Sequence, residues 1–364
     1  MQYRHILDSF KEYVWESSNE EISNSTGIDI NHIRRFDTNT SPYRPSHWLK
    51  KLSKDLPNLD INQYPDTSYT NLRKKLSNYI GVDCDRIVVA NGADEAFDII
   101  SKTYLDQGFA SIESSPTYSY YRIISELNSS KMISIPRKKN FSDNVDTILN
   151  NIDNTTRIIY LCSPNNPTGN SVDRNDILRI LNETKSNVVI DEAYQEYGGE
   201  SFIDLTEEYD NLLIVKTLSK AFALAGARIG YIVGCKRAVD LLNKVRPPNS
   251  LNVISLRLAE FALDDVNWTK RKIKIILKER DRCMKEISHI KNVKTYPSDA
   301  NFFLIEFLNK SSESVCNSLI KKGLVLRKLK GHPVLENCLR FSVGLPKHND
   351  EFLVSLQNIM DNHK

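Results

Sequence analysis

The stretch Leu212-Leu-Ile-Val-Lys-Thr-Leu-Ser-Lys-Ala-Phe-Ala-Leu-Ala-Gly-Ala-Arg228 joins a short apolar run to a segment of small residues that contains a lysine. Residues 212–215 are apolar throughout, which is typical of a parallel strand buried on both faces. From about residue 69 the same order recurs: a short β-branched run, a turn and a helical stretch. This alternation predicts an α/β fold with a parallel sheet covered by helices. The other strand candidates are residues 86–90, 157–162, 187–190 and 229–233.

The pattern changes on either side of this region. After residue 250 come a long, charged helical stretch at residues 254–288 and short strands near 300–305 and 338–343. These segments predict a second, smaller α+β domain. Residues 1–45 are polar and broken by turn formers, and they predict an arm with one short helix.

The composition argues against several classes of protein. The 364 residues include 49 Lys and Arg against 46 Asp and Glu, and this net charge of +3 is too balanced for a surface that coats nucleic acid. The densest basic run, residues 270–282, includes acidic residues and predicts a solvated helix face. Without an apolar leader or a long apolar run, we expect a cytoplasmic protein with no membrane span. The scattered cysteines lack a Cys-x-x-Cys pair, which argues against a zinc site and a disulfide framework.

The residues that follow the predicted strands are the candidates for chemistry, because an open α/β sheet binds its ligand outside the carboxyl ends of its strands. The motif Asn91-Gly-Ala-Asp-Glu-Ala96 is a glycine turn into a helix, whose free N–H groups could hold a phosphate. An ordinary strand-to-helix turn would look the same. The motif Ser163-Pro-Asn-Asn-Pro-Thr-Gly169 holds Asn166 before a proline with its amide free for a ligand, although this composition also suits a surface turn.

Two further strand ends carry ionisable side chains. Asp191 stands at the tip of the strand at 187–190, where a buried carboxylate is costly unless it meets a cation, although it could instead cap a helix. Lys220 lies among Ala, Phe and Leu, where desolvation favours the neutral, nucleophilic amine. A single lysine more commonly extends its ammonium to water. Thr217, Ser219 and Arg228 flank Lys220 and could hold a phosphate dianion.

These strand ends offer the groups that pyridoxal phosphate requires: an amine for its aldehyde carbon, an anion at its pyridine nitrogen, donors at its phenolic oxygen and a phosphate cup. The sequence closely resembles the fold-type-I pyridoxal-phosphate aminotransferases, and within them the histidinol-phosphate aminotransferase branch. The motifs that carry this resemblance cover most of the chain: Tyr64-Pro65, Asn91-Gly-Ala-Asp-Glu95, Ser115-Pro-Thr-Tyr118, Ser163-Pro-Asn-Asn-Pro-Thr-Gly169, Asp191-Glu-Ala-Tyr194, Thr217-Leu-Ser-Lys-Ala-Phe-Ala-Leu-Ala-Gly226 with Arg228, and Asn337-Cys-Leu-Arg-Phe-Ser-Val-Gly344.

The resemblance implies the architecture of that family. A large cofactor-binding domain with a mostly parallel central sheet would span residues 46–250. A smaller α+β domain would come from both chain ends, residues 1–45 with the N-terminal arm plus residues 251–364. In this family a tyrosine that matches Tyr64 reaches the phosphate bound by the partner subunit, which implies that the active unit is a homodimer.

The resemblance also implies a role for each motif residue. Lys220 would bond to the cofactor and move the proton during transamination, and Asp191 would pair with the pyridinium nitrogen. The other implied cofactor contacts are Asn166 and Tyr194 at the phenolic oxygen, Tyr118 against the ring, and the backbone of Ala93 and Asp94 with Thr217, Ser219 and Arg228 at the phosphate.

Four residues are implied in substrate binding. Arg340 matches an arginine that holds the substrate carboxylate in amino-acid-specific relatives and the substrate phosphate in the histidinol-phosphate branch. Arg327 resembles the second phosphate-binding arginine of that branch, although a basic loop is usually solvated. Two guanidiniums suit a dianion better than a carboxylate. Asn39 matches an Asn that lines the substrate, and Tyr13 a substrate-contacting Tyr in the pattern Tyr-x-Pro-Gly, which here reads Tyr13-Val-Trp-Glu.

The resemblance therefore predicts a transaminase of histidine biosynthesis that moves an amino group between L-histidinol phosphate and 2-oxoglutarate in two half-reactions through the pyridoxamine form of the cofactor. An aromatic-amino-acid aminotransferase and a threonine-phosphate decarboxylase are alternatives on the same scaffold. A pyridoxal-phosphate-binding regulator would need a DNA-binding module, for which neither end has room. A nicotinamide-dependent dehydrogenase would need a G-x-G-x-x-G motif after a strand, and the sequence contains none.

Overall fold

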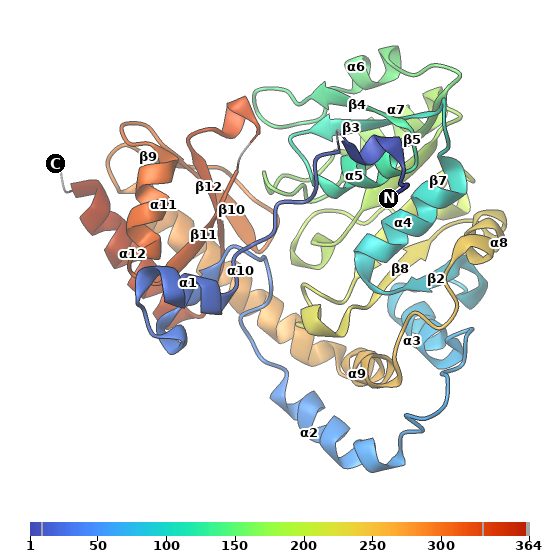
Figure 1. Ribbon diagram of the computed structural model, residues 1–364, viewed down its shortest axis with the longest axis horizontal. Helices are drawn as coiled ribbons and strands as arrows, with labels where there is room; N and C mark the ends of the chain where they lie inside the picture. The colour runs from blue at the N-terminus through green and yellow to red at the C-terminus, as the bar shows by residue number, and fades with distance from the viewer. Residues whose placement is uncertain (9, 330, 362–364) are drawn as a thin grey trace.

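The computed structural model describes residues 1–8, 10–329 and 331–361, which form two sheets lying side by side (Figure 1). The larger sheet comes from the middle of the chain, and the smaller one combines a strand near the N-terminus with strands after residue 290. The long helix α10 (Val266–Ser288) leads from the first to the second. Within the described ranges, no helix has the length and apolar character needed to cross a membrane.

The larger sheet has the strand order β2-β8-β7-β6-β5-β3-β4. Its strands are β2 (Ile87–Ala90), β3 (Ala110–Ser115), β4 (Lys131–Pro136), β5 (Thr156–Cys162), β6 (Asn187–Asp191), β7 (Leu212–Thr217) and β8 (Gly230–Val233). The sheet is parallel except at β8, which is antiparallel to β2 and β7. The prediction of a parallel strand at 229–233 is therefore wrong in direction, because the chain returns from β7 to β8 without a crossover helix.

The strand predictions for β2, β5, β6, β7 and β8 are confirmed, but the apolar pattern does not predict β3 and β4. β3 buries polar side chains that find partners: Ser111 Oγ donates to Ser125 Oγ over 2.8 Å, and Glu113 Oε1 accepts from Ser134 Oγ over 2.7 Å. β4 is an edge strand with one buried side chain, Ile135. Neither strand shows the continuous apolar run of a buried parallel strand.

Helices cover both faces of the larger sheet, because its strands are apolar on both sides. One apolar cluster joins the sheet to α4 (Gly92–Tyr104), α5 (Tyr120–Leu127) and α8 (Lys236–Val245). On the other face pack α3 (Thr70–Ile80), α6 (Val145–Asn150), α7 (Arg174–Glu183) and α9 (Val253–Asp264). Helix α2 (Ser46–Asp55) packs against α9.

The smaller sheet has the order β1-β11-β12-β10-β9. Its strands are β1 (Arg34–Phe36), β9 (Val293–Thr295), β10 (Phe302–Phe307), β11 (Leu324–Lys328) and β12 (Cys338–Ser342). The predicted strands near 300–305 and 338–343 are confirmed as β10 and β12. Phe341 stacks on Phe36 and Phe352, with ring centroids 4.9 and 4.3 Å apart, and so joins the sheet to α12 (Pro346–Asp361). Helix α11 (Ser312–Ile320) packs on β11.

Two predictions concern the chain outside the larger sheet. The arm contains the expected short helix, α1 (Asn19–Thr26), which begins at a capping box in which Ser18 and Glu21 each accept the other's backbone N–H. The single helical stretch predicted at 254–288 is wrong. The chain breaks at Asp265, whose carboxylate caps α10 by accepting from Trp268 N over 3.3 Å.

Candidate active site

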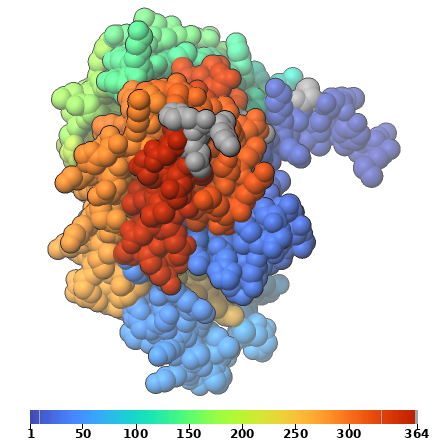
Figure 2. Space-filling model, turned by 90° about the vertical axis from the view of Figure 1, so that its left-hand side faces the viewer, coloured from blue at the N-terminus to red at the C-terminus, as the bar shows by residue number. Residues whose placement is uncertain are grey.

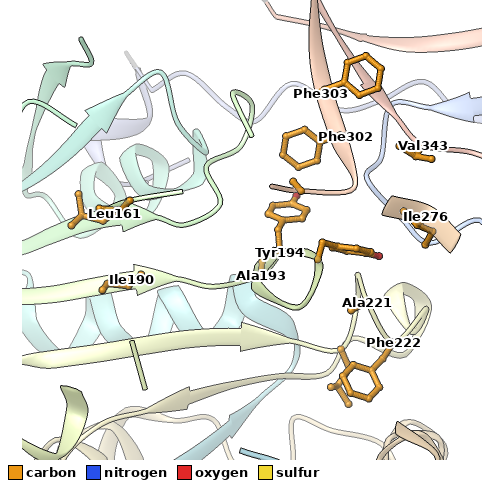
Figure 3. Packing of buried hydrophobic residues seen from close by; sticks show 14 of the residues in the cluster. Leu161, Ile190, Ala193, Tyr194, Ala221, Phe222, Ile276, Phe302, Phe303 and Val343 are labelled. Carbon is orange, nitrogen blue, oxygen red and sulfur yellow. The ribbon is translucent and has the colours of Figure 1, made fainter. Parts of the chain in front are cut away.

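The carboxyl ends of the parallel strands face the smaller sheet, and the predicted site residues lie at this junction. Figure 3 shows Tyr194 between the end of β6, near Ile190, and Phe302 of β10. The rings of Tyr194 and Phe302 lie edge to face with centroids 5.0 Å apart. One continuous apolar cluster runs from the larger sheet into the smaller one, so both sheets hold the site.

Asp191 is the last residue of β6, and its side chain is buried. Its Oδ2 accepts from the Tyr121 hydroxyl over 2.6 Å, and its Oδ1 accepts from Ala193 N over 2.9 Å. Burial raises the pKa of Asp191 to about 6, and the hydrogen bond from Tyr121 opposes that rise. A cation facing this carboxylate would therefore be strongly favoured.

Lys220 lies in the loop after β7, and its surroundings disfavour the charged form of its amine. Burial, followed by the charge of Arg340, lowers the pKa of Lys220 to about 8. Lys220 Nζ donates to the Thr38 carbonyl over 3.1 Å and lies 5.7 Å from the centroid of the Tyr194 ring. An appreciable fraction of the amine is thus uncharged near neutral pH, as a nucleophile requires.

An anion cradle is built where α4 begins. The backbone N–H groups of Ala93 and Asp94 lie in the first turn of α4, where they lack intrahelical acceptors. The Asp94 carboxylate accepts from Arg228 Nη2 over 2.7 Å and from the Tyr118 hydroxyl over 2.9 Å. Gly92 has φ +85°, and a Cβ added there would lie 2.8 Å from Arg228 Nη2. The absence of a side chain at Gly92 therefore leaves the space beside the helix terminus in which the guanidinium lies.

Two hydroxyls lie near this cradle, because Thr217 is paired with Gly230, where an added Cβ would lie 2.4 Å from the backbone carbon of Gly92. Thr217 Oγ1 lies 2.9 Å from Ser219 Oγ and accepts from Ser219 N over 3.1 Å. Thr217 Oγ1 also donates to the Ile229 carbonyl over 2.9 Å, which ties the end of β7 to the residue before β8. Both side chains are buried, so their polar atoms are fixed in position.

Arg340 and Arg327 come from adjacent strands of the smaller sheet and are paired directly across β11 and β12. Arg340 is buried and donates to Asn166 Oδ1 and to the Asp37 carbonyl. Its Nε is buried and has no hydrogen-bond partner among the residues that the structure describes. A buried donor without a partner is costly, so this guanidinium is suited to a further anionic acceptor.

The N-terminal arm completes this side of the site. Asn39 is buried, and its Nδ2 donates to the Tyr194 hydroxyl over 3.0 Å. The Tyr13 hydroxyl donates to Glu16 Oε1 over 3.3 Å. Burial and then Glu16 raise the pKa of Tyr13, while the charges of Arg327 and Arg340 oppose that shift. Glu16 Oε1 also lies 2.6 Å from Arg327 Nη1, so Tyr13 and Arg327 meet the same carboxylate oxygen. Although the arm lacks Pro-Gly, its tyrosine reaches the site.

The structure brings the predicted residues together with one exception. Tyr64 lies on the loop before α3, and its side chain is 85% exposed. The contacts that were not predicted include those of Tyr121 with Asp191, of Thr38 with Lys220 and of Glu16 with Arg327. Of these, only Tyr121 has a sequence signal, since it lies three residues after Tyr118.

Comparison with known proteins agrees with this geometry. Residues 31–356 match the family described as aminotransferase class I and II. The chain belongs to this family. The aminotransferase is 36% identical to histidinol-phosphate aminotransferase of Methanocaldococcus jannaschii over 98% of this chain and 97% of that protein.

Two crystal structures show how the aminotransferase compares in fold. Histidinol-phosphate aminotransferase from Clostridium acetobutylicum has a TM-score of 0.82 at 26% identity, covering 90% of this chain and 99% of that one. L-threonine-O-3-phosphate decarboxylase from Porphyromonas gingivalis has a TM-score of 0.78 at 23% identity, and the match covers 90% of this chain and 99% of that one. The fold alone therefore does not separate transamination from decarboxylation.

The cofactor of the aminotransferase is pyridoxal phosphate, and the residues present fit it. A buried carboxylate at Asp191 suits the ring nitrogen, and an amine of lowered pKa at Lys220 suits the aldehyde. The turn at Gly92, where a Cβ would collide with Arg228, suits a phosphate group at the start of α4. The buried carboxylate and the buried amine are both costly to a chain without a ligand, and the cofactor carries a group that offsets each cost.

Proposed function

We propose that the aminotransferase transfers the amino group of L-histidinol phosphate to 2-oxoglutarate, in histidine biosynthesis in the cytoplasm. The observation that carries this proposal is the pairing of Arg327 with Arg340 across β11 and β12, with Arg340 Nε buried and unpartnered among the described residues. Two guanidiniums can bind a phosphate dianion through several charge-assisted hydrogen bonds. The name of the relative from Methanocaldococcus jannaschii supports the same substrate.

The proposed roles of the cofactor-site residues follow from their surroundings. When bound, pyridoxal phosphate supplies an aldehyde that takes up the amino group and a pyridinium ring that accepts electron density from the substrate α-carbon. Lys220 Nζ, with its pKa lowered to about 8, would accept and return the proton of that carbon. Asp191 would stay ionised against the pyridinium nitrogen, because an opposite charge lowers the pKa of a carboxyl.

The other proposed cofactor contacts keep the group in place. Asn166 and Tyr194 would donate to its phenolic oxygen, and Tyr118 would lie against its ring. The phosphate would be bound by the N–H groups of Ala93 and Asp94, by the hydroxyls of Thr217 and Ser219, and by Arg228. Asp94 pairs with Arg228 and with the Tyr118 hydroxyl, so it would orient both residues.

We also propose a homodimer in which Tyr64 reaches the cofactor phosphate bound by the partner subunit. The 85% exposure of Tyr64, in a loop that also exposes Ile61 by 63%, supports a surface that a second copy covers. Within each subunit, residues 46–250 would form the cofactor-binding domain and residues 1–45 plus 251–364 the small domain. The pairing of β1 with β11 supports the assignment of both chain ends to the small domain.

A set of half-reactions tests the substrate. Protein loaded with the cofactor is mixed with histidinol phosphate, histidine, phenylalanine or threonine phosphate, and the cofactor absorbance is followed. We expect fast conversion with histidinol phosphate, reversed by 2-oxoglutarate. Release of carbon dioxide from threonine phosphate would favour the decarboxylase, and preferential conversion of phenylalanine would favour the aromatic aminotransferase.

A variant tests the phosphate site directly. Arg327→Ala removes one charge-assisted contact, so kcat/KM for histidinol phosphate should fall about tenfold to a hundredfold. The loss for glutamate should be smaller, because its side chain ends in a carboxylate. Lys328→Ala is a matched control that removes the neighbouring positive charge, which instead pairs with Glu313. Unchanged kinetics of Arg327→Ala toward histidinol phosphate would argue for an aromatic substrate.

A further inference from the structure

The N-terminal arm places a carboxylate on one of the two substrate-site arginines. Glu16 Oε1 lies 2.6 Å from Arg327 Nη1, and Arg327 Nη2 donates to the Val14 carbonyl over 3.4 Å. The same Glu16 oxygen accepts from the Tyr13 hydroxyl. Glu16 stands where the pattern Tyr-x-Pro-Gly has glycine, so this carboxylate is a feature of this chain's own sequence.

The charge of the site explains why an anion is held there. Arg327 and Arg340 are directly opposite each other, and like charges in that position repel. Arg340 is bound by two neutral acceptors, Asn166 Oδ1 and the Asp37 carbonyl. Glu16 is the only carboxylate within ion-pair distance of either guanidinium among the residues that the structure describes. Within this described part of the chain, it therefore supplies the one direct counter-charge of the arginine pair.

The segment that carries Glu16 is weakly attached. Residues 10–18 form neither helix nor strand, and Val14 and Trp15 are 69% and 78% exposed. The arm passes in front of the junction between the two sheets (Figure 1), and the N-terminal residues protrude from the body (Figure 2). The nearest firm attachment is the Ser17 carbonyl, which accepts from Arg35 Nη1 over 2.8 Å. Moving the Glu16 side chain away from Arg327 would thus break few contacts and uncover little apolar core.

We propose that Glu16 occupies the phosphate subsite of the substrate-free enzyme as an internal anion, and that an incoming substrate phosphate displaces it from Arg327. Glu16 is then a determinant of substrate affinity, since every anion that binds must first separate this ion pair. This inference rests on the proposed function, because it takes the two arginines as the anion site. Substrate binding is thereby coupled to separation of Glu16 from Arg327.

Binding of inorganic phosphate to the cofactor-loaded protein tests the proposal, with calorimetry above the second pKa of phosphate as the readout. Glu16→Gln should bind phosphate about tenfold more tightly than wild type, the change expected when one partly shielded charged contact no longer has to be broken. The affinity of Glu16→Gln for sulfate should increase by the same factor, because every anion that binds to wild type has to displace the same Glu16 carboxylate. The control Glu12→Gln removes an equal charge from the same arm and should change nothing.

The dependence on Arg327 gives the second part of the test. In an Arg327→Ala background, Glu16→Gln should have no effect on phosphate affinity. Equal affinities of Glu16→Gln and wild type would overturn the proposal, as would weaker binding by Glu16→Gln, which would mean that Glu16 positions Arg327 for the ligand. Failure of the proposed function is a separate result: wild type would not react with histidinol phosphate, while the phosphate titrations would remain interpretable.

Discussion

Tyr121 donates its hydroxyl hydrogen to Asp191 Oδ2 over 2.6 Å, so that a residue of α5 holds the carboxylate at the end of β6. The tyrosine is itself fixed, because its buried ring is stacked on Tyr160 with centroids 4.9 Å apart and planes 3° apart. The second carboxylate oxygen accepts from Ala193 N. Asp191 is thus held in one orientation before any cofactor binds.

Tyr121→Phe should impair the reaction while leaving the ring packing intact. The hydrogen bond from Tyr121 lowers the pKa of Asp191, so its loss raises that pKa and weakens the carboxylate as a partner of the pyridinium. We expect kcat to fall about tenfold, the cost of one hydrogen bond to a charged group, and the acid limb of the kcat profile to move to higher pH. Tyr120→Phe, the same change on the preceding residue, should retain the wild-type profile. A Tyr121→Phe profile identical to wild type would show that Ala193 alone orients the carboxylate.

Asp191 should destabilise the cofactor-free protein at alkaline pH. Its pKa is about 6 in the folded chain, above the value of about 3.9 expected when unfolded. The folded chain therefore binds more protons between about pH 4 and 6, so stability falls as the pH rises through this window. Cofactor-free Asp191→Asn should be more stable than wild type at about pH 8, by on the order of 3 kcal/mol, with a smaller gap at about pH 5. Urea unfolding at both pH values measures the gap, and an equal gap at both would contradict the assignment.

Those parts of the fold and site that depend on local sequence could be predicted. The strand ends at Asp191 and Lys220 follow from short apolar runs, and parallel strands bring such ends to one edge of the sheet. The predictions were wrong where tertiary packing determines the direction of a strand or the end of a helix. β8 runs antiparallel to its neighbours, and the helical stretch at 254–288 breaks at Asp265.

Contacts between distant segments could not be predicted from one sequence. Tyr121 and Asp191 are 70 residues apart, and Lys220 lies 182 residues from Thr38. Such pairs depend on how α5 and the arm pack on the sheet edge. The burial of polar residues in β3 could not be predicted for the same reason, since their hydrogen-bond partners lie on α5 and β4.

Lys220 should be the lysine that bonds to the cofactor. Borohydride reduction of the loaded protein, followed by mass mapping, should place the adduct on Lys220, and attachment to cofactor-free protein should accelerate as the pH rises through about 8. Lys216 serves as an internal control. Burial opposes its charge, but Glu196 and Glu192 outweigh that effect and raise the pKa of Lys216, so it stays protonated. An adduct on Lys216, or a rate independent of pH, would contradict the prediction.

Gly92→Ala should damage the phosphate cradle. The added Cβ would lie 2.8 Å from Arg228 Nη2, on a residue whose φ of +85° already disfavours a side chain. The guanidinium would have to leave the start of α4, where it approaches the N–H groups that we assign to the cofactor phosphate. We expect the dissociation constant for pyridoxal phosphate to rise about tenfold or more, as for loss of one charge-assisted contact.

The control for this prediction is Gly226→Ala in the loop between β7 and β8. A Cβ at Gly226 meets no atom of the described residues within 4 Å, and Gly226 has no left-handed φ. This variant should bind the cofactor as wild type does. Because Gly92→Ala also strains the backbone, thermal unfolding of both cofactor-free variants separates a general loss of stability from a local loss of binding. Gly92→Ala could instead lose stability but bind pyridoxal phosphate with wild-type affinity. Phosphate binding would then not depend on the position of Arg228 beside the turn. The helix terminus and the hydroxyls of Thr217 and Ser219 would hold the phosphate alone.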